Sequence, residues 1–143
     1  SLPQSATLTA PSSEGALSAV SASATNPNYK RGIHMILYRP VGQAEYELIA
    51  QSDFTAYPPR LPEQPIFYPV LNEQYAREIA EKWNRRYPDS QYTGYVTTFE
   101  IDDTYISQFS IQTVGASYHK EFWIPAEELD NFNRHIIGKI EII

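Results

Sequence analysis

The chain has no cysteine among its 143 residues and little concentrated positive charge. The absence of cysteine excludes disulfides, zinc–thiolate sites and cysteine nucleophiles. The formal net charge is −6, and basic residues gather only in pairs such as Lys30–Arg31 and Arg85–Arg86. Because a nucleic-acid groove needs a concentrated basic surface, we expect no stable binding to DNA. RNA as a briefly bound substrate remains open.

Long hydrophobic runs and the common catalytic motifs are absent as well. No segment approaches the roughly 20 apolar residues of a membrane span, so no membrane association is predicted. The sequence contains no Walker A loop, no dinucleotide-binding glycine fingerprint, no H-E-x-x-H and no G-x-S-x-G elbow. His34, His119 and His135 share no metal-ligand spacing, which predicts no metal site. The chain also starts without Met, as expected of a fragment of a longer protein.

Composition divides the chain near residue 31. Residues 1–31 are rich in Ser, Ala, Thr and Pro and show no sustained apolar period, which is typical of a linker or a loosely held arm. Residues 32–143 consist of apolar blocks separated by turn signals. Their length suits one compact domain, and a hydrophobic fraction of 42% can build its core.

Apolar spacing within residues 32–143 predicts a mixture of short helices and strands. Helices are expected at 42–51, 72–86, 102–106 and 125–133, and strands at 33–39, 66–70, 95–101, 109–114, 121–124 and 139–143. Asn72 is a suitable N-cap, and Pro125 is expected as the first residue of its helix. This order predicts an α+β domain with two small antiparallel or mixed sheets.

Five pieces of sequence follow one another in a suggestive order. They are LYR at 37–39, QSDF at 51–54, IFY at 66–68, AREIAEKW at 76–83 and HKEFWIP at 119–125. In order and spacing they resemble the ADP-ribosyltransferase superfamily, in particular the small C-terminal toxin domains of bacterial polymorphic (Rhs-type) toxins. The resemblance covers about residues 33–143. It implies a split pair of small β-sheets with flanking helices around an NAD cleft.

The resemblance also implies which residues act on NAD, the substrate. Cleavage of the nicotinamide–ribose bond develops positive charge on the ribose, which a carboxylate can stabilise, and Glu121 is expected to do so. Arg39, next to Tyr38 at the end of its strand, is expected to bind the pyrophosphate or adjoining ribose through its planar set of donors. Tyr68 is expected to stack on nicotinamide, with Phe67 or Tyr75 as substitutes.

Two positions depart from the family pattern. His119 stands two residues before Glu121, where many members carry a Glu or Gln that positions the acceptor, so His119 is a candidate for that role and the acceptor stays open. The segment Phe67–Tyr68–Pro69 replaces the Ser-Thr-Ser of many members, which suggests a more aromatic nicotinamide pocket.

The expected function is that of a mono-ADP-ribosyltransferase toxin. Such a domain would be exported as part of a larger toxin and would modify a macromolecular acceptor, protein or RNA, in the cytoplasm of a target cell. A cognate immunity protein would then be a partner. Two alternatives are a non-enzymatic binding module on the same fold and a small ribonuclease toxin with His119 and Glu121 as acid and base. The acidic net charge counts against the ribonuclease.

Overall fold

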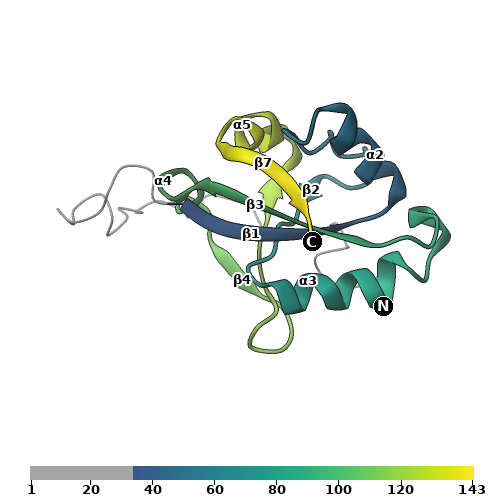
Figure 1. Ribbon diagram of the computed structural model, residues 1–143. Coiled ribbons are helices and arrows are strands. Elements are labelled where there is room, and N and C mark those ends of the chain that lie inside the picture. The colour runs from purple at the N-terminus through teal and green to yellow at the C-terminus, as the bar shows by residue number, and fades with distance from the viewer. Residues whose placement is uncertain (1–33) are drawn as a thin grey trace.

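The computed structural model describes residues 34–143, and the expected arm at 1–31 lies outside this range. The described part is an α+β domain with four α-helices and small antiparallel sheets (Figure 1). The strands are β1 (His34–Val41), β2 (Ile66–Phe67), β3 (Tyr95–Asp102), β4 (Ile111–Thr113), β5 (Lys120–Phe122), β6 (Ile124–Pro125) and β7 (Ile136–Ile142). The helices are α2 (Gln43–Gln51), α3 (Glu73–Ile79), α4 (Asp103–Ile106) and α5 (Leu129–Arg134). The expected α+β class is thus confirmed.

Several element ends differ from the sequence prediction. The helix expected at 72–86 is α3 followed by a π-helical turn at Ala80–Asn84, and Asn72 caps α3 as predicted. Pro125 ends β6 and caps a short 3-10 turn, Ala126–Glu128, that leads into α5. The last strand is longer than expected and starts at Ile136.

One residue, Val70, connects the three-stranded sheet with the β4–β5 pair. Strands β1, β3 and β7 form an antiparallel sheet, while β2 pairs with β6 and β4 pairs with β5. Val70 pairs with Tyr38 of β1 on one side and with Glu121 of β5 on the other. Its N–H and carbonyl both bond to Tyr38, at 2.8 and 2.9 Å. The segment before α3 therefore lies between the strands that carry Arg39 and Glu121.

After the Tyr38–Val70 pair, the end of β1 and the segment with β2 separate from each other. Arg39–Val41 pair with β3, whereas Ile66–Phe67 pair with β6. We call this divergence of Arg39–Val41 from Ile66–Tyr68 the fork. Alternate residues of an extended strand direct their backbone groups to opposite edges, so Pro40, two residues after Tyr38, faces the fork. Its missing N–H costs no ladder bond there, which explains why β1 runs through the proline rather than stopping at Arg39 as predicted.

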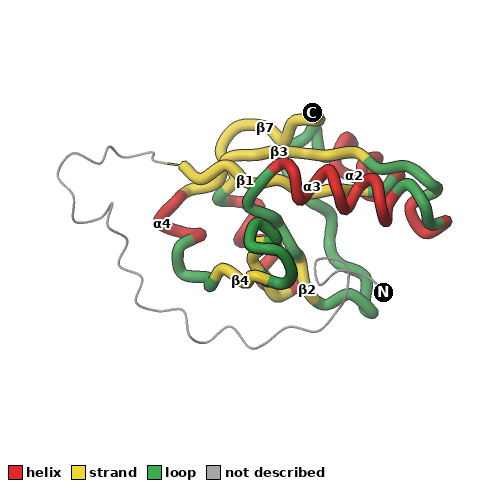
Figure 2. Tube along the Cα trace, turned by 90° about the horizontal axis from the view of Figure 1, so that it is seen from below, coloured by secondary structure: helices red, strands yellow, loops and turns green. Residues whose placement is uncertain are grey.

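Helices cover both faces of the sheet around β1. In Figures 1 and 2, α3 lies along one face of β1 and β3, and α5 lies on the opposite side in Figure 1. The α3 side has a core of Val70, Tyr75, Ala76, Ile79, Ala80 and Val96. The other side holds the larger core, which includes Leu37, Ile49, Phe67, Phe99, Phe122, Leu129 and Phe132. None of the helices in residues 34–143 is long and apolar enough to cross a membrane.

Candidate active site

Glu121 of β5 is a completely buried carboxylate, with 0% of its surface exposed. The Tyr75 hydroxyl donates to Oε1 at 2.9 Å, and the Trp123 indole Nε1 donates to Oε2 at 2.6 Å. Burial raises the pKa of Glu121 to about 7, although the hydrogen bonds from Trp123 and Tyr75 act to lower it. The carboxylate is therefore held in place by two neutral donors and is close to its titration midpoint at neutral pH.

Asn72 positions Tyr75 against Glu121. Its Oδ1 accepts the backbone N–H of Tyr75 at 2.8 Å, as an N-cap does, and its Nδ2 donates to the carbonyl of Tyr118 at 2.5 Å. One side chain thus starts α3 and ties that start to the chain just before β5. The cap that the sequence predicts for helix formation also fixes the geometry of the site.

Among the described residues, His119 is linked to the Glu121 carboxylate through Tyr75 and not directly. The rings of His119 and Tyr75 are stacked, with centroids 4.4 Å apart and planes 21° apart. The N–H of Ala116 donates to Nδ1 at 3.1 Å, which places the imidazole proton on Nε2, 3.2 Å from Oε1 of Glu78. Both ring nitrogens are thus engaged, and the ring supports Tyr75 rather than pointing to the Glu121 carboxylate.

Two residues next to His119 were not predicted from the sequence. A Cβ on Gly115 would lie 2.4 Å from Nδ1 of His119, so the imidazole needs glycine there. Glu78 also accepts from the Tyr118 hydroxyl, and this bond, followed by the one from His119, holds the pKa of Glu78 below its usual range. Glu78 lies three residues after Tyr75, on the same face of the helical segment. This spacing in the sequence could have indicated that the two side chains lie close together.

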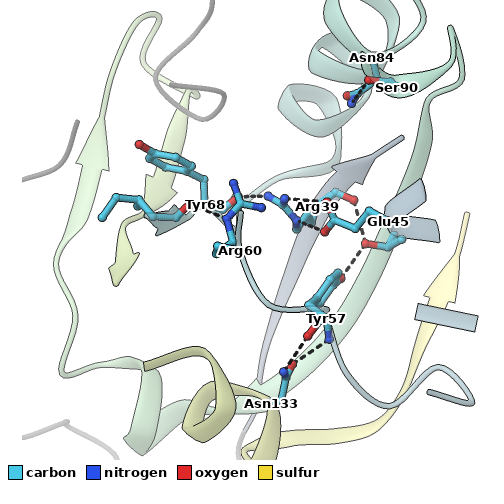
Figure 3. Close-up of polar contacts among 10 residues, drawn as sticks. Arg39, Glu45, Tyr57, Arg60, Tyr68, Asn84, Ser90 and Asn133 are labelled. Atoms are coloured by element: carbon cyan, nitrogen blue, oxygen red, sulfur yellow. Dashed lines mark hydrogen bonds and ion pairs between the residues drawn. The ribbon is translucent and has the colours of Figure 1, made fainter. Parts of the chain in front are cut away.

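Arg39 lies in the fork and is 7% exposed. Its Nε and Nη2 donate to the two carboxylate oxygens of Glu45 at 2.7 and 3.0 Å, and Nη1 is 3.5 Å from the carbonyl of Tyr68 (Figure 3). The guanidinium also lies 4.7 Å from the centroid of the Phe67 ring. Burial acts to lower the pKa of Arg39, but the charge and hydrogen bonds of Glu45 outweigh it and raise the pKa. This is an oriented, permanently charged guanidinium.

The predicted aromatic residues occupy different environments. Phe67 is in the core, with Tyr57 and Phe132 against its ring as well as Arg39. Tyr68 is buried, and its ring lies edge-on to Trp123 at 6.3 Å. The half-buried Tyr38 packs against the core on the α3 side.

The predicted residues therefore form two contiguous groups. One holds Glu121, Tyr75 and His119, and the other holds Arg39 with its neighbours in β2. Tyr68 and Trp123 connect the groups, because Tyr68 accepts from Arg39 through its carbonyl while its ring meets the indole that donates to Glu121. Within residues 34–143, no direct contact joins Arg39 to Glu121.

Arg60 is a further charged residue in the fork. It is half-buried, and its Nε donates to the carbonyl of Ile66 at 2.9 Å. Burial, and next the positive charge of Arg39, lower the pKa of Arg60 to about 10. Its place could not be predicted from the sequence, because the proline-rich loop at 52–65 has no period that would indicate a direction for the Arg60 side chain.

Across the described residues, no three His, Asp or Glu side chains are grouped so that they could hold a metal ion. Comparison with known proteins gives no matching family model, no matching curated protein and no matching solved structure. The chemistry available is that of a buried carboxylate, a charged guanidinium and the aromatic side chains between them.

Proposed function

We propose that this chain is a mono-ADP-ribosyltransferase that cleaves NAD, with Glu121 stabilising the reacting ribose. The observation that carries the proposal is a wholly buried carboxylate whose hydrogen-bond donors, Tyr75 and Trp123, are neutral. Such an anion is under-stabilised, as its raised pKa reflects, and gains most from a positive charge placed beside it. Cleavage of NAD supplies that charge as the transition state forms, so Glu121 would bind the transition state more tightly than the substrate.

The proposed step needs no strong general acid. The bond between the nicotinamide nitrogen and the ribose C1′ breaks, and the electron pair leaves with nicotinamide, which becomes neutral. The acceptor atom then bonds to C1′, and its proton passes to solvent. Glu121 accepts a hydrogen bond from a ribose hydroxyl and stabilises the cationic sugar. Tyr68 would stack on nicotinamide, and Arg39 would contact the diphosphate or adjoining ribose.

Substrate binding in this proposal requires a side chain to move, because the Glu121 carboxylate has no exposed surface. Trp123 is the best candidate. It is half-buried, it occupies Oε2 of Glu121, and its ring lies against Tyr68. Rotation of this one indole would free a carboxylate oxygen and remove the contact between the indole and the Tyr68 ring.

The arrangement of strands supports the family resemblance. The strand with Arg39, the segment with Tyr68 and the strand with Glu121 come from distant parts of the sequence, yet they lie side by side through Val70. On that basis we further propose a toxin domain that is exported within a larger protein and modifies a protein or RNA acceptor in the cytoplasm of a target cell. A cognate immunity protein would be its partner.

The test is NAD turnover by the purified chain, alone and with a cell lysate. Nicotinamide release and transfer of labelled ADP-ribose should both occur, and Glu121→Gln should lower both by at least about a hundredfold. Glu127→Gln is the matched control, because Glu127 is exposed on the turn after β6. Equal labelling by the Glu121 variant and the wild type would contradict the assignment. If the wild type labels the lysate, mass spectrometry identifies the modified acceptor.

A further inference from the structure

The fork between β1 and β2 contains two guanidinium groups on one stretch of backbone. Arg39 approaches the carbonyl of Tyr68 from β1, and Arg60 donates to the carbonyl of Ile66 from the proline-rich loop. The two carbonyls belong to residues i and i+2 of an extended segment, so they face the same edge and lie about 6.6 Å apart. Figure 3 shows the two arginine side chains next to each other beside Tyr68.

The pair carries more positive charge than its surroundings neutralise. Glu45 is bonded in bidentate fashion to Arg39, and Arg60 forms no ion pair within residues 34–143. Two arginines against one carboxylate leave a local charge of about +1 in a chain whose net charge is −6. The lowered pKa of Arg60 records the same imbalance, because burial and the charge of Arg39 both disfavour its protonated form.

The donors of Arg60 are available to a ligand. A guanidinium has five N–H groups in a planar set, and the contacts of Arg60 in the described part of the chain use only Nε. Arg60 is also more exposed than Arg39. Its bond to Ile66 therefore orients the side chain while its terminal nitrogens can bind oxygens of a phosphate group.

We propose that Arg60 is a further substrate-binding residue, and that Arg60 and Arg39 together bind the diphosphate of the dinucleotide. The choice of NAD as the ligand rests on the proposed function, whereas the site for a diphosphate rests on the two arginines. Arg60 makes the direct contact through its terminal nitrogens. Arg39 contributes charge and a donor from Nη1, because Glu45 occupies its other edge.

Arg60→Gln in the full chain tests this inference. It should raise the KM for NAD by about tenfold or more, the loss expected for a charge-assisted hydrogen bond, while kcat changes less than about twofold. Arg60→Lys keeps the charge but loses the planar set of donors, so its KM should fall between those of Gln and wild type. Arg86→Gln, which removes an exposed arginine, should leave KM unchanged. Thermal unfolding of each variant shows whether it is folded, and the Lys variant serves if the Gln variant is not.

Calorimetric titration with inorganic pyrophosphate separates failure of this inference from failure of the proposed function. Weaker pyrophosphate binding by the Arg60 variants supports the site even if the wild type does not cleave NAD. If the wild type cleaves NAD and the folded Arg60 variants keep its KM and its affinity for pyrophosphate, the inference is wrong and the proposed function stands. If the wild type binds no pyrophosphate and the Arg60 variants keep their KM for NAD, the inference is likewise overturned.

Discussion

Substitution of Glu121 by Gln should change the pH dependence of stability in a calculable way. The fold raises the pKa of this carboxyl from 4.5 to about 7. The folded state therefore favours the protonated form, and stability that is fully present below pH 4.5 is lost as the pH rises through about 7. At about 1.36 kcal/mol per pKa unit, the total loss is about 3 kcal/mol, most of which falls between pH 5 and pH 8.

Glutamine at position 121 does not ionise, so this loss disappears from the variant. A glutamine has one acceptor where the carboxylate has two, and either Tyr75 or Trp123 then faces an amide donor. That mismatch should cost about 1–2 kcal/mol at every pH. We therefore expect Glu121→Gln to be less stable than the wild type at pH 5 and more stable at pH 8.

Urea unfolding monitored by tryptophan fluorescence at pH 5, 6, 7 and 8 measures both proteins in the same buffers. In the difference between their free energies of unfolding, the pH-dependent contributions of all other titrating groups cancel. This difference should change by about 2–3 kcal/mol across this range, equivalent to about 10 °C in Tm for a domain of this size. Parallel curves would show that Glu121 ionises in the fold as it does in water, and would refute the argument that its charge is under-stabilised.

Three further predictions concern the same network and the last strand. Arg39→Ala should lower the free energy of unfolding by about 3–5 kcal/mol, because Glu45 loses its cation in a mostly buried site, and adding Glu45→Gln should recover part of the loss in urea unfolding. Additive losses would argue against the pair. Tyr75→Phe removes a donor to ionised Glu121, so the pH at which NAD cleavage is half-maximal should increase, and an unchanged pH profile would contradict this role. Gly138→Ala should lower stability by about 1 kcal/mol in thermal unfolding through strain at φ +75°, since a Cβ there meets no neighbour, and an unchanged Tm would contradict it.

Local patterns predicted the helices and the central strands well. Asn72 was identifiable as a cap because capping depends on residues within one turn, and the alternation at 95–101 gave the interior of β3. The path of residues 66–70 was not predictable in detail. Whether Val70 pairs with Tyr38, with Glu121 or with both depends on strands that are distant in sequence, and no local propensity encodes that choice.

In the candidate site, too, single residues were predictable from the sequence, whereas the contacts between them were not. Glu121 and Tyr75 were both selected from the sequence, but the hydrogen bond between them spans 46 residues and became visible only in the fold. The pairing of Arg39 with Glu45 was also hidden, although β1 leads directly into α2. The indole of Trp123 gave no signal of its own, because the sequence does not show which partner the N–H of a tryptophan will find.

The energetic position of Glu121 argues for a function independently of any family. A buried ionisable group that lowers the stability of a small domain by about 3 kcal/mol above neutral pH is a large cost where total stability is about 5–15 kcal/mol. A neutral glutamine in the same place carries no charge to stabilise, and it loses only one of the two acceptors that Tyr75 and Trp123 use. What only a carboxylate supplies there is a fixed negative charge, and that charge is useful when a cation forms beside it. The stability of Glu121→Gln at pH 8 and its loss of NAD cleavage therefore both test whether this charge serves a function. We expect a variant that is more stable than the wild type and inactive. A variant that is less stable and fully active would show that Glu121 is only structural.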